Sequence, residues 1–485
     1  MLFQTPAFLL GFLPVCLAGF FACGRLGRHN AALAWMVAAS TFFYGWWNPR
    51  LVPLLAGSIA VNYMVGGRIL HCARANRPAA ARRWLIAGIA FNLGLLGWFK
   101  YADFLLHIAV PDAAPLDIFL PLAISFFTFQ QIMFLVDTAR HQYDAPDPLT
   151  YAAFVSFFPH LIAGPIVRPR DIIPQLRSSM LSTPLAANLA DGLLVLLLGL
   201  AKKLVLADTF GGFADIGFDA AAHGASLSFV EAWYAVLAYS LQIYFDFSAY
   251  SDMAIGLARM LNVRFPLNFN SPYQARNIAE FWRRWHITLG MFLRDYVYVP
   301  LGGSRQGELR RAINLFGTML LCGLWHGAAW RFVLWGGLHG MFLVCNANCR
   351  VTLPRAAAQT LTLFAVIVAW VPFRAATPDA TLTMLRGMAG LNGIALPQMI
   401  VHAVPLLDRI ATPVPLLPWL GDARTLSFPE VSACLLLGWF IVLALPHVHE
   451  LSDRARHWAL TAGFAFSVQA MFFAPHVAPF LYFRF

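Results

Sequence analysis

The chain has 485 residues, of which 59% are hydrophobic, 14% are aromatic and only 12% are charged. A soluble domain covers its surface with roughly a quarter of charged residues, so this composition excludes a soluble globular protein and indicates a polytopic membrane protein. The formal net charge of +11 is explained by membrane topology and by attraction to anionic membrane lipid. Binding to nucleic acid is the less favoured explanation, and we expect none.

Apolar stretches follow one another along the chain, and most approach the roughly 20 residues that a helix needs to cross the hydrocarbon core. They lie near residues 1–23, 31–47, 51–66, 84–99, 118–136, 186–206, 228–249, 312–348, 359–373, 432–447 and 457–475. The stretch 312–348 is long enough for two helices. The pattern therefore predicts an all-α polytopic membrane protein of about a dozen transmembrane or re-entrant helices, forming one integral-membrane domain over residues 1–485.

The first apolar stretch begins MLFQTPAF without a basic residue, and the first charge, Arg25, follows the apolar run. We therefore expect a retained helix whose N-terminus lies outside, rather than a cleaved signal. The loop expected at 68–83 contains five arginines and no acid. This loop is predicted to lie inside, in agreement with the first assignment.

Two carboxylates interrupt the apolar sequence QIYFDFSAYSDMAIGLARMLN, residues 242–262. If this stretch is helical, Asp246 and Asp252 lie near different faces. Buried carboxylates usually pair with an arginine or cap a helix break, and Arg259 and Arg264 are the nearest candidates in sequence. We interpret both carboxylates as structural, with a catalytic role as the alternative.

The segment 264–311 is basic, with eight arginines and three acids. It includes EFWRRWHITLGMFLRDYVYVPLGGSR, in which aromatic and arginine side chains flank His286, as expected at a membrane interface. Such a surface suits phosphates, whether of a lipid headgroup or of a nucleotide-like coenzyme, or an acidic protein partner. The candidate phosphate contacts are Arg276, Arg283, Arg284 and Arg294, which would bind the donor if the phosphate belongs to a coenzyme. A cytoplasmic segment that obeys the positive-inside rule is the alternative, and it explains the charge but not the histidine.

A second histidine, His326, lies in CGLWHGAAW, within a run from Ile313 to Leu334 whose only other charge is Arg331. An ionisable residue at membrane depth costs at least about 2.5–3.5 kcal/mol, which makes it a functional candidate. Imidazole can carry either a proton or a lone pair near neutral pH. The alternative is a neutral histidine that is hydrogen-bonded inside the helix bundle.

The sequence does not suggest a metal site. Two histidines without a nearby carboxylate or thiolate make a poor closed site, and the seven cysteines contain no CxxC pair and resemble buried hydrophobic residues. The stretch 375–431 is rich in proline and less continuously apolar. It predicts an extramembrane excursion with short amphipathic pieces.

Several motifs occur in an order that resembles a known family. They are FFPHLIAGPIVRPRDIIPQL at 157–176, the stretch from QIYFDFSAYSD to YVPLGGSR, NLFGTMLLCGLWHGAAWRFVLWGGLHG, and PFLYFRF. Together they closely resemble the bacterial alginate O-acetyltransferase branch of the membrane-bound O-acyltransferase family, over essentially the whole chain. The resemblance implies helices around a central funnel or tunnel, with the hallmark histidine at His326 and a second active-site polar residue at His286. The chain departs mildly from the pattern at Ala249, His160 and Gly290, so His160 is not assigned to the site.

The resemblance also implies an activity, the transfer of acetyl groups to hydroxyls. His326 would act as the base, while His286 would orient it, polarise the thioester or shuttle the proton. The expected acyl donor substrate is acetyl-CoA in the cytoplasm, with no bound cofactor. Acetyl groups would cross the bacterial inner membrane to periplasmic acetyltransferase partner proteins and then to an exported polysaccharide, alginate first, with cellulose or peptidoglycan as alternatives. A non-catalytic translocator or scaffold of a polysaccharide-modification complex is the competing hypothesis.

Overall fold

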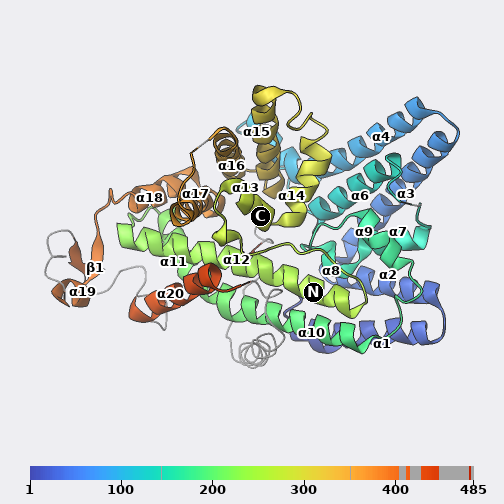
Figure 1. Cartoon of the computed structure of the whole chain (residues 1–485), viewed down its shortest axis with the longest axis horizontal. Coiled ribbons are helices and arrows are strands. Elements are labelled where there is room, and N and C mark those ends of the chain that lie inside the picture. Colours follow the sequence, from blue (N-terminus) through green and yellow to red (C-terminus); the bar gives the residue numbers. More distant parts are fainter. Residues whose placement is uncertain (144, 350, 404–410, 415–427, 447–479, 482–485) are drawn as a thin grey trace. The chain divides into compact units, whose positions relative to one another are not determined.

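The computed structural model describes residues 1–143, 145–349, 351–403, 411–414, 428–446 and 480–481. Nearly all regular structure in this part of the chain is helical (Figure 1). The exception is a pair of short parallel strands, β1 (Ala395–Pro397) and β2 (Thr412–Val414). The prediction of a helical protein is confirmed, and the small sheet is a departure from a purely α-helical fold. Proline lacks the N–H group that a helix interior requires, so Pro397 and Pro413 disfavour helix at this point.

Contacts divide the chain into two compact units, Met1–Leu200 with Tyr250–Asn268, and Ala201–Ala249 with Phe269–Phe485. The helices of the first unit are η1 (Ala7–Phe12), α1 (Leu13–Arg25), α2 (His29–Gly45), η2 (Pro49–Leu51), α3 (Val52–Arg74), α4 (Pro78–Leu96), η3 (Gly97–Tyr101), α5 (Ala102–Ala109), α6 (Ile124–Ala139), α7 (Pro148–Ser156), α8 (Phe158–Leu161), α9 (Pro169–Leu176) and α10 (Ala186–Ala201). The long helix α12 (Phe229–Met260) begins in the second unit and ends in the first.

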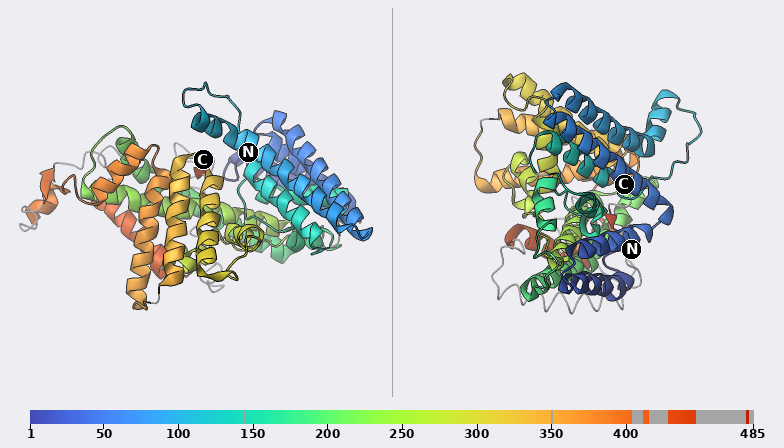
Figure 2. Two further views of the ribbon diagram at one scale, coloured as in Figure 1. Left: turned by 90° about the horizontal axis from the view of Figure 1, so that it is seen from above. Right: turned by 90° about the vertical axis from the view of Figure 1, so that its right-hand side faces the viewer.

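Helices α3, α4 and α6 pack together in the first unit, as the blue and teal helices of Figure 2 show. Two asparagines join α3 to α4 inside this group: the Asn92 Nδ2 atom donates to Asn62 Oδ1 at 2.6 Å, and the Asn62 Nδ2 atom donates in return at 3.2 Å. Each amide also donates to the backbone carbonyl four residues earlier in its own helix. The pair therefore satisfies two buried polar side chains that would be costly if left without partners.

Four helical stretches among the described residues are long and apolar enough to cross a membrane: Ala7–Arg25, Pro49–Arg74, Pro78–Ala109 and Arg355–Arg374. Two shorter apolar helices, α6 and α20, reach 16 and 17 residues. The expected stretch 118–136 gives only a short helix because its first residues are not helical. The count of about a dozen helices and the central funnel therefore stay predictions, and the stretch 457–475 lies outside the described residues.

The loop expected at 68–83 is much shorter in the structure. Helix α3 ends at Arg74 and α4 begins at Pro78, so most of the basic residues lie on helix ends. Arginine near the C-terminus of a helix interacts favourably with the helix dipole, and Pro78 suits the first turn of the next helix. A three-residue connection is therefore sufficient here.

The second unit contains η4 (Lys202–Ala207), α11 (Asp208–Ala222), the first part of α12, η5 (Pro272–Gln274), α13 (Ile278–Arg284), α14 (Ile287–Leu293), η6 (Arg294–Tyr298), α15 (Gly307–His326), α16 (Trp330–Asn348), α17 (Arg355–Arg374), α18 (Pro378–Met388), α19 (Gln398–Ala403) and α20 (Phe428–Ala444). Helices α18 and α19 and both strands fall within the proline-rich stretch 375–431, of which residues 404–410 and 415–427 are not described. Its assignment as an extramembrane excursion stays a prediction.

Helices α15, α16 and α17 lie side by side in the second unit (Figure 2). The backbones of α15 and α16 meet at two glycines: a Cβ atom on Gly323 would lie 2.1 Å from the Phe332 carbonyl oxygen and 3.0 Å from Gly336 Cα. Small residues of this kind allow helices in a membrane to approach closely. The contact brings the end of α15, where His326 lies, against the first turns of α16.

Candidate active site

His326 is the last residue of α15, which ends because Gly327 adopts an extended conformation. Its side chain is buried, with 6% of its surface exposed. The imidazole ring packs edge-on against Trp335 and Phe373, at centroid distances of 5.1 and 5.3 Å. These contacts from α16 and α17 fix the ring in an aromatic environment of low polarity.

His286 occupies the turn between α13 and α14 and is also buried, with 1% exposed. Its backbone has a φ of 43° and a ψ of 53°, in the left-handed region, which costs a non-glycine residue about 1–2 kcal/mol. Its ring packs edge-on against Phe247 at 4.7 Å and lies 6.3 Å from the Trp325 ring, which in turn lies 4.9 Å from that of His326. The fold thus brings two histidines that are 40 positions apart in sequence to one indole ring.

A narrow cavity with a free volume of about 20 Å³ lies beside His326. Its walls are largely aromatic, with Asp246 and His326 as the titratable side chains. A space of this size holds about one water-sized group. Because its walls have a low dielectric constant, fixed dipoles interact strongly with any charge that develops inside it.

Asp246 and Asp252 have different surroundings, although both lie on α12 and both are buried. Asp246 belongs to the second unit and lines the cavity, whereas Asp252 belongs to the first unit. Asp246 forms an ion pair with Lys203 at 2.7 Å, and not with Arg259 or Arg264. The sequence-based pairing was wrong because the partner comes from a preceding helical segment, while Arg259 pairs with Asp191 at 3.5 Å.

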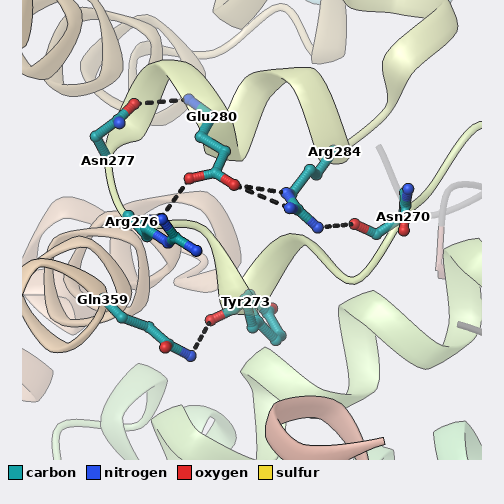
Figure 3. Close-up of polar contacts among 7 residues, drawn as sticks. All are labelled: Asn270, Tyr273, Arg276, Asn277, Glu280, Arg284 and Gln359. Carbon is teal, nitrogen blue, oxygen red and sulfur yellow. Dashed lines mark hydrogen bonds and ion pairs between the residues drawn. The ribbon is translucent and has the colours of Figure 1, made fainter. Parts of the chain in front are cut away.

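Glu280 organises part of the basic segment (Figure 3). Its carboxylate accepts hydrogen bonds from the Arg276 backbone N–H at 2.9 Å and from the Arg284 Nε–H at 3.0 Å, and Arg284 also donates to the Asn270 carbonyl at 3.2 Å. Asn277 caps α13 by accepting from the Glu280 backbone N–H at 2.8 Å. Partial burial acts to raise the pKa of Glu280, but these hydrogen bonds and the two arginine charges hold that pKa below its ordinary value.

The four arginines proposed as donor contacts therefore fall into two groups. Arg284 pairs with Glu280, and Arg294 pairs with Asp295 at 2.6 Å. Arg276 and Arg283 have exposed side chains, and neither forms an ion pair with another described residue. Donor binding stays a prediction for all four, and the exposed pair has guanidinium groups available for a phosphate.

One buried histidine of the second unit, His339 on α16, was missed by the sequence analysis. Its Nδ1 atom accepts a hydrogen bond from the Trp282 indole N–H at 3.3 Å, and its ring packs against Trp335 at 4.8 Å. Its side chain is completely buried. The signal was the same as for His326, an ionisable residue in the apolar sequence LWGGLHGMF, and the argument from burial cost applied equally to it.

Metal ligation finds no support in the part of the chain that the structure describes, because no three histidine, cysteine or acidic side chains gather there. The available chemistry is that of imidazole, indole and carboxylate groups around a small cavity. Such a set can move a proton and donate hydrogen bonds to a developing oxyanion.

Comparison with known proteins identifies the family. The model of the membrane-bound O-acyltransferase family, MBOAT, matches residues 116–373, which include both histidines. The peptidoglycan O-acetyltransferase of Helicobacter pylori is 40% identical over 525 aligned residues, which cover 100% of this chain and 98% of that protein. This chain belongs to the membrane-bound O-acyltransferase family.

Other MBOAT relatives match a smaller share of the chain. The probable alginate O-acetylase AlgI of Pseudomonas aeruginosa is 40% identical over 403 residues, covering 80% of this chain and 75% of that protein. The teichoic acid D-alanyltransferase of Bacillus subtilis is 27% identical over 254 residues, covering 51% of this chain and 63% of that protein. Family membership and the membrane-spanning helices together show a multi-pass membrane O-acyltransferase.

Proposed function

We propose that this MBOAT enzyme takes acetyl groups from acetyl-CoA at the cytoplasmic face of the bacterial inner membrane and passes them across for O-acetylation of a cell-surface glycan. The observation that carries the proposal is the position of His326, buried at the end of an apolar helix and lining a narrow cavity with a free volume of about 20 Å³. Such a cavity matches an acetyl group better than a long acyl chain.

The proposed step balances without a cofactor. The neutral His326 imidazole takes the proton of an acceptor hydroxyl, the hydroxyl oxygen attacks the thioester carbonyl carbon, and a tetrahedral oxyanion forms. The C–S bond then breaks, and the leaving thiolate takes the proton back from His326. Trp335 lines the cavity beside His326, and its indole N–H has no acceptor among the described residues. It is a candidate donor to the oxyanion, with His286 as the second candidate.

Two glycans are candidate acceptors. Peptidoglycan is supported by the relative whose match extends over the whole chain, and we place it first. Alginate, which the motif resemblance favoured, is supported by a match of equal identity over 80% of the chain. The route to either glycan would run through periplasmic acetyltransferase partner proteins, because the polymer lies outside the membrane while the donor lies inside.

The first experiment replaces His326 with alanine and measures glycan acetylation in cells together with the amount of protein in the membrane. Acetylation should be lost while abundance stays normal, because the base is missing but the helix remains intact. His339→Gln is the matched control, since it removes another buried imidazole of the same helix bundle that does not line the cavity. Full acetylation in the His326→Ala strain would leave the scaffold hypothesis in place of a catalytic one.

The second experiment identifies the acceptor. A deletion strain is grown, and its peptidoglycan and exopolysaccharide are purified and analysed by mass spectrometry. Loss of O-acetyl groups from the peptidoglycan alone would support the first candidate. Loss from the exopolysaccharide alone would replace it with the second.

A further inference from the structure

Asp246, which lies in the wall of the His326 cavity, belongs to a buried ion pair. Lys203 Nζ, in η4, lies 2.7 Å from Asp246 Oδ1 and 2.7 Å from Asp208 Oδ1. The Lys203 and Asp246 side chains are 4% and 3% exposed. One ammonium group thus contacts two carboxylates, and a carboxylate has further oxygen lone pairs that can accept hydrogen bonds.

That donor comes from a distant part of the chain. The backbone N–H of Leu481 donates to the second carboxylate oxygen of Asp246, Oδ2, at 2.8 Å. The donor and the acceptor are 235 positions apart in sequence. A hydrogen bond from a backbone N–H to an ionised carboxylate is stronger than one between neutral groups, so Asp246 fixes the backbone at this point.

This contact shapes the candidate active site. Phe480 and Leu481 line the same cavity as Asp246 and His326. Phe480 also packs on Phe247 at a centroid distance of 6.0 Å, and Phe247 is the ring against which His286 packs. Withdrawal of the Phe480–Leu481 segment would remove one wall of the cavity and enlarge it.

We infer that the Lys203–Asp246 pair is a positioning element that holds the Phe480–Leu481 segment as a wall of the His326 cavity and thereby restricts the enzyme to short acyl groups. The inference rests on the proposed function and deepens it, since it names the structural feature that selects acetyl over longer acyl donors. Asp246 acts here through the segment that it holds, and not by contact with the reacting atoms.

The first test removes the backbone N–H of residue 481, which donates the hydrogen bond to Asp246, and leaves the buried charges unchanged. Leu481→Pro lacks the backbone N–H, whereas Leu481→Ala keeps it, and both lose the leucine side chain. Acyl transfer is measured with acetyl-CoA and with butyryl-CoA as donors. The ratio of kcat/KM for butyryl-CoA to that for acetyl-CoA should be roughly tenfold or more higher in Leu481→Pro than in Leu481→Ala, the effect of losing one hydrogen bond to a charged group. Equal ratios in the two variants would overturn the inference.

The second test needs no acyl transfer, so it separates this inference from the proposed function. A cysteine is placed at position 480 by Phe480→Cys, with Asp246→Asn or without it, and its modification by a membrane-permeant thiol reagent is followed by peptide mass spectrometry. Asp246→Asn keeps the shape of the side chain but weakens its contacts with Lys203 and with the Leu481 N–H, so labelling at position 480 should be about tenfold faster. The fully buried Cys322 serves as the internal reference, and its labelling should not change.

Two results of the labelling test would overturn the inference. Unchanged labelling at position 480 would show that Asp246 does not hold the segment. Faster labelling at both cysteines would show that the ion pair only stabilises the fold. The His326→Ala change is made in the same Phe480→Cys background. Loss of activity there, with the same labelling rate at position 480 as in Phe480→Cys alone, would support separate roles for the catalytic residue and the positioning pair.

Discussion

Replacement of Gly323 by alanine tests the packing that presents His326 to the cavity. The added Cβ atom would lie 2.1 Å from the Phe332 carbonyl oxygen, which is 1.3 Å short of the 3.4 Å of an ordinary contact. The obstructing atoms belong to the backbone of α16, so no side chain can rotate to relieve the overlap. The helices must separate, and overpacking of this kind costs about 1–3 kcal/mol.

The same separation should affect activity. His326 lies three residues beyond Gly323 on α15, and its ring contacts Trp335, the residue before Gly336 on α16. A shift of α15 against α16 would displace the base relative to the cavity wall, and small displacements of a catalytic group lower the rate strongly. We therefore expect Gly323→Ala to reduce both the thermal stability and the acetylation rate.

The assay heats detergent-solubilised protein and measures the monodisperse fraction by size-exclusion chromatography, with acetylation measured in parallel. Gly317→Ala on the same helix is the matched control, because a Cβ atom there would meet nothing within 4 Å. That control should be neutral or gain roughly 0.5–1 kcal/mol from the better helix propensity of alanine. Wild-type stability and activity in Gly323→Ala would refute the packing argument.

Four further outcomes can be measured independently. His286→Asn should retain measurable acetylation and His286→Ala should retain less, because an orienting group is more replaceable than the base. Equal and complete loss of acetylation in both variants would indicate that His286 itself carries the proton. Arg283→Lys should raise the KM for acetyl-CoA roughly tenfold to a hundredfold if the Arg283 guanidinium binds phosphate through a bidentate contact. Arg284→Lys should instead lower the amount of folded protein, because the Arg284 guanidinium forms an ion pair with Glu280. Wild-type behaviour in both variants would remove the donor-site proposal. The folded-state pKa of Glu280 is depressed, so its contribution to stability is present above its ordinary pKa of about 4 and is lost as pH falls through the lower folded value. Glu280→Gln should therefore reduce stability at neutral pH and weaken this acid dependence in melting experiments. An unchanged pH profile would contradict the assignment. Acetylation in detergent should persist after treatment with a chelator, and its loss would indicate a metal requirement.

Composition and order of motifs determined the class of this protein without any coordinates. A chain with so few charges cannot cover a soluble surface, and that argument needs no knowledge of which residues touch. His326 stood out because an ionisable side chain in a long apolar run is costly wherever the run lies in the fold. The same argument applied to His339, so local sequence could not say which of the two buried histidines lines a cavity.

Tertiary structure decided which polar groups act together. Sequence proximity suggested Arg259 or Arg264 as the partner of Asp246, but the fold supplies Lys203 from one side and the Leu481 backbone from the other. Side-chain periodicity fixes which face of a helix a residue occupies, whereas the neighbour on that face depends on how helices distant in sequence pack. For this reason the sequence could nominate single residues of the site, while the cavity and its positioning pair emerged only from the packed chain.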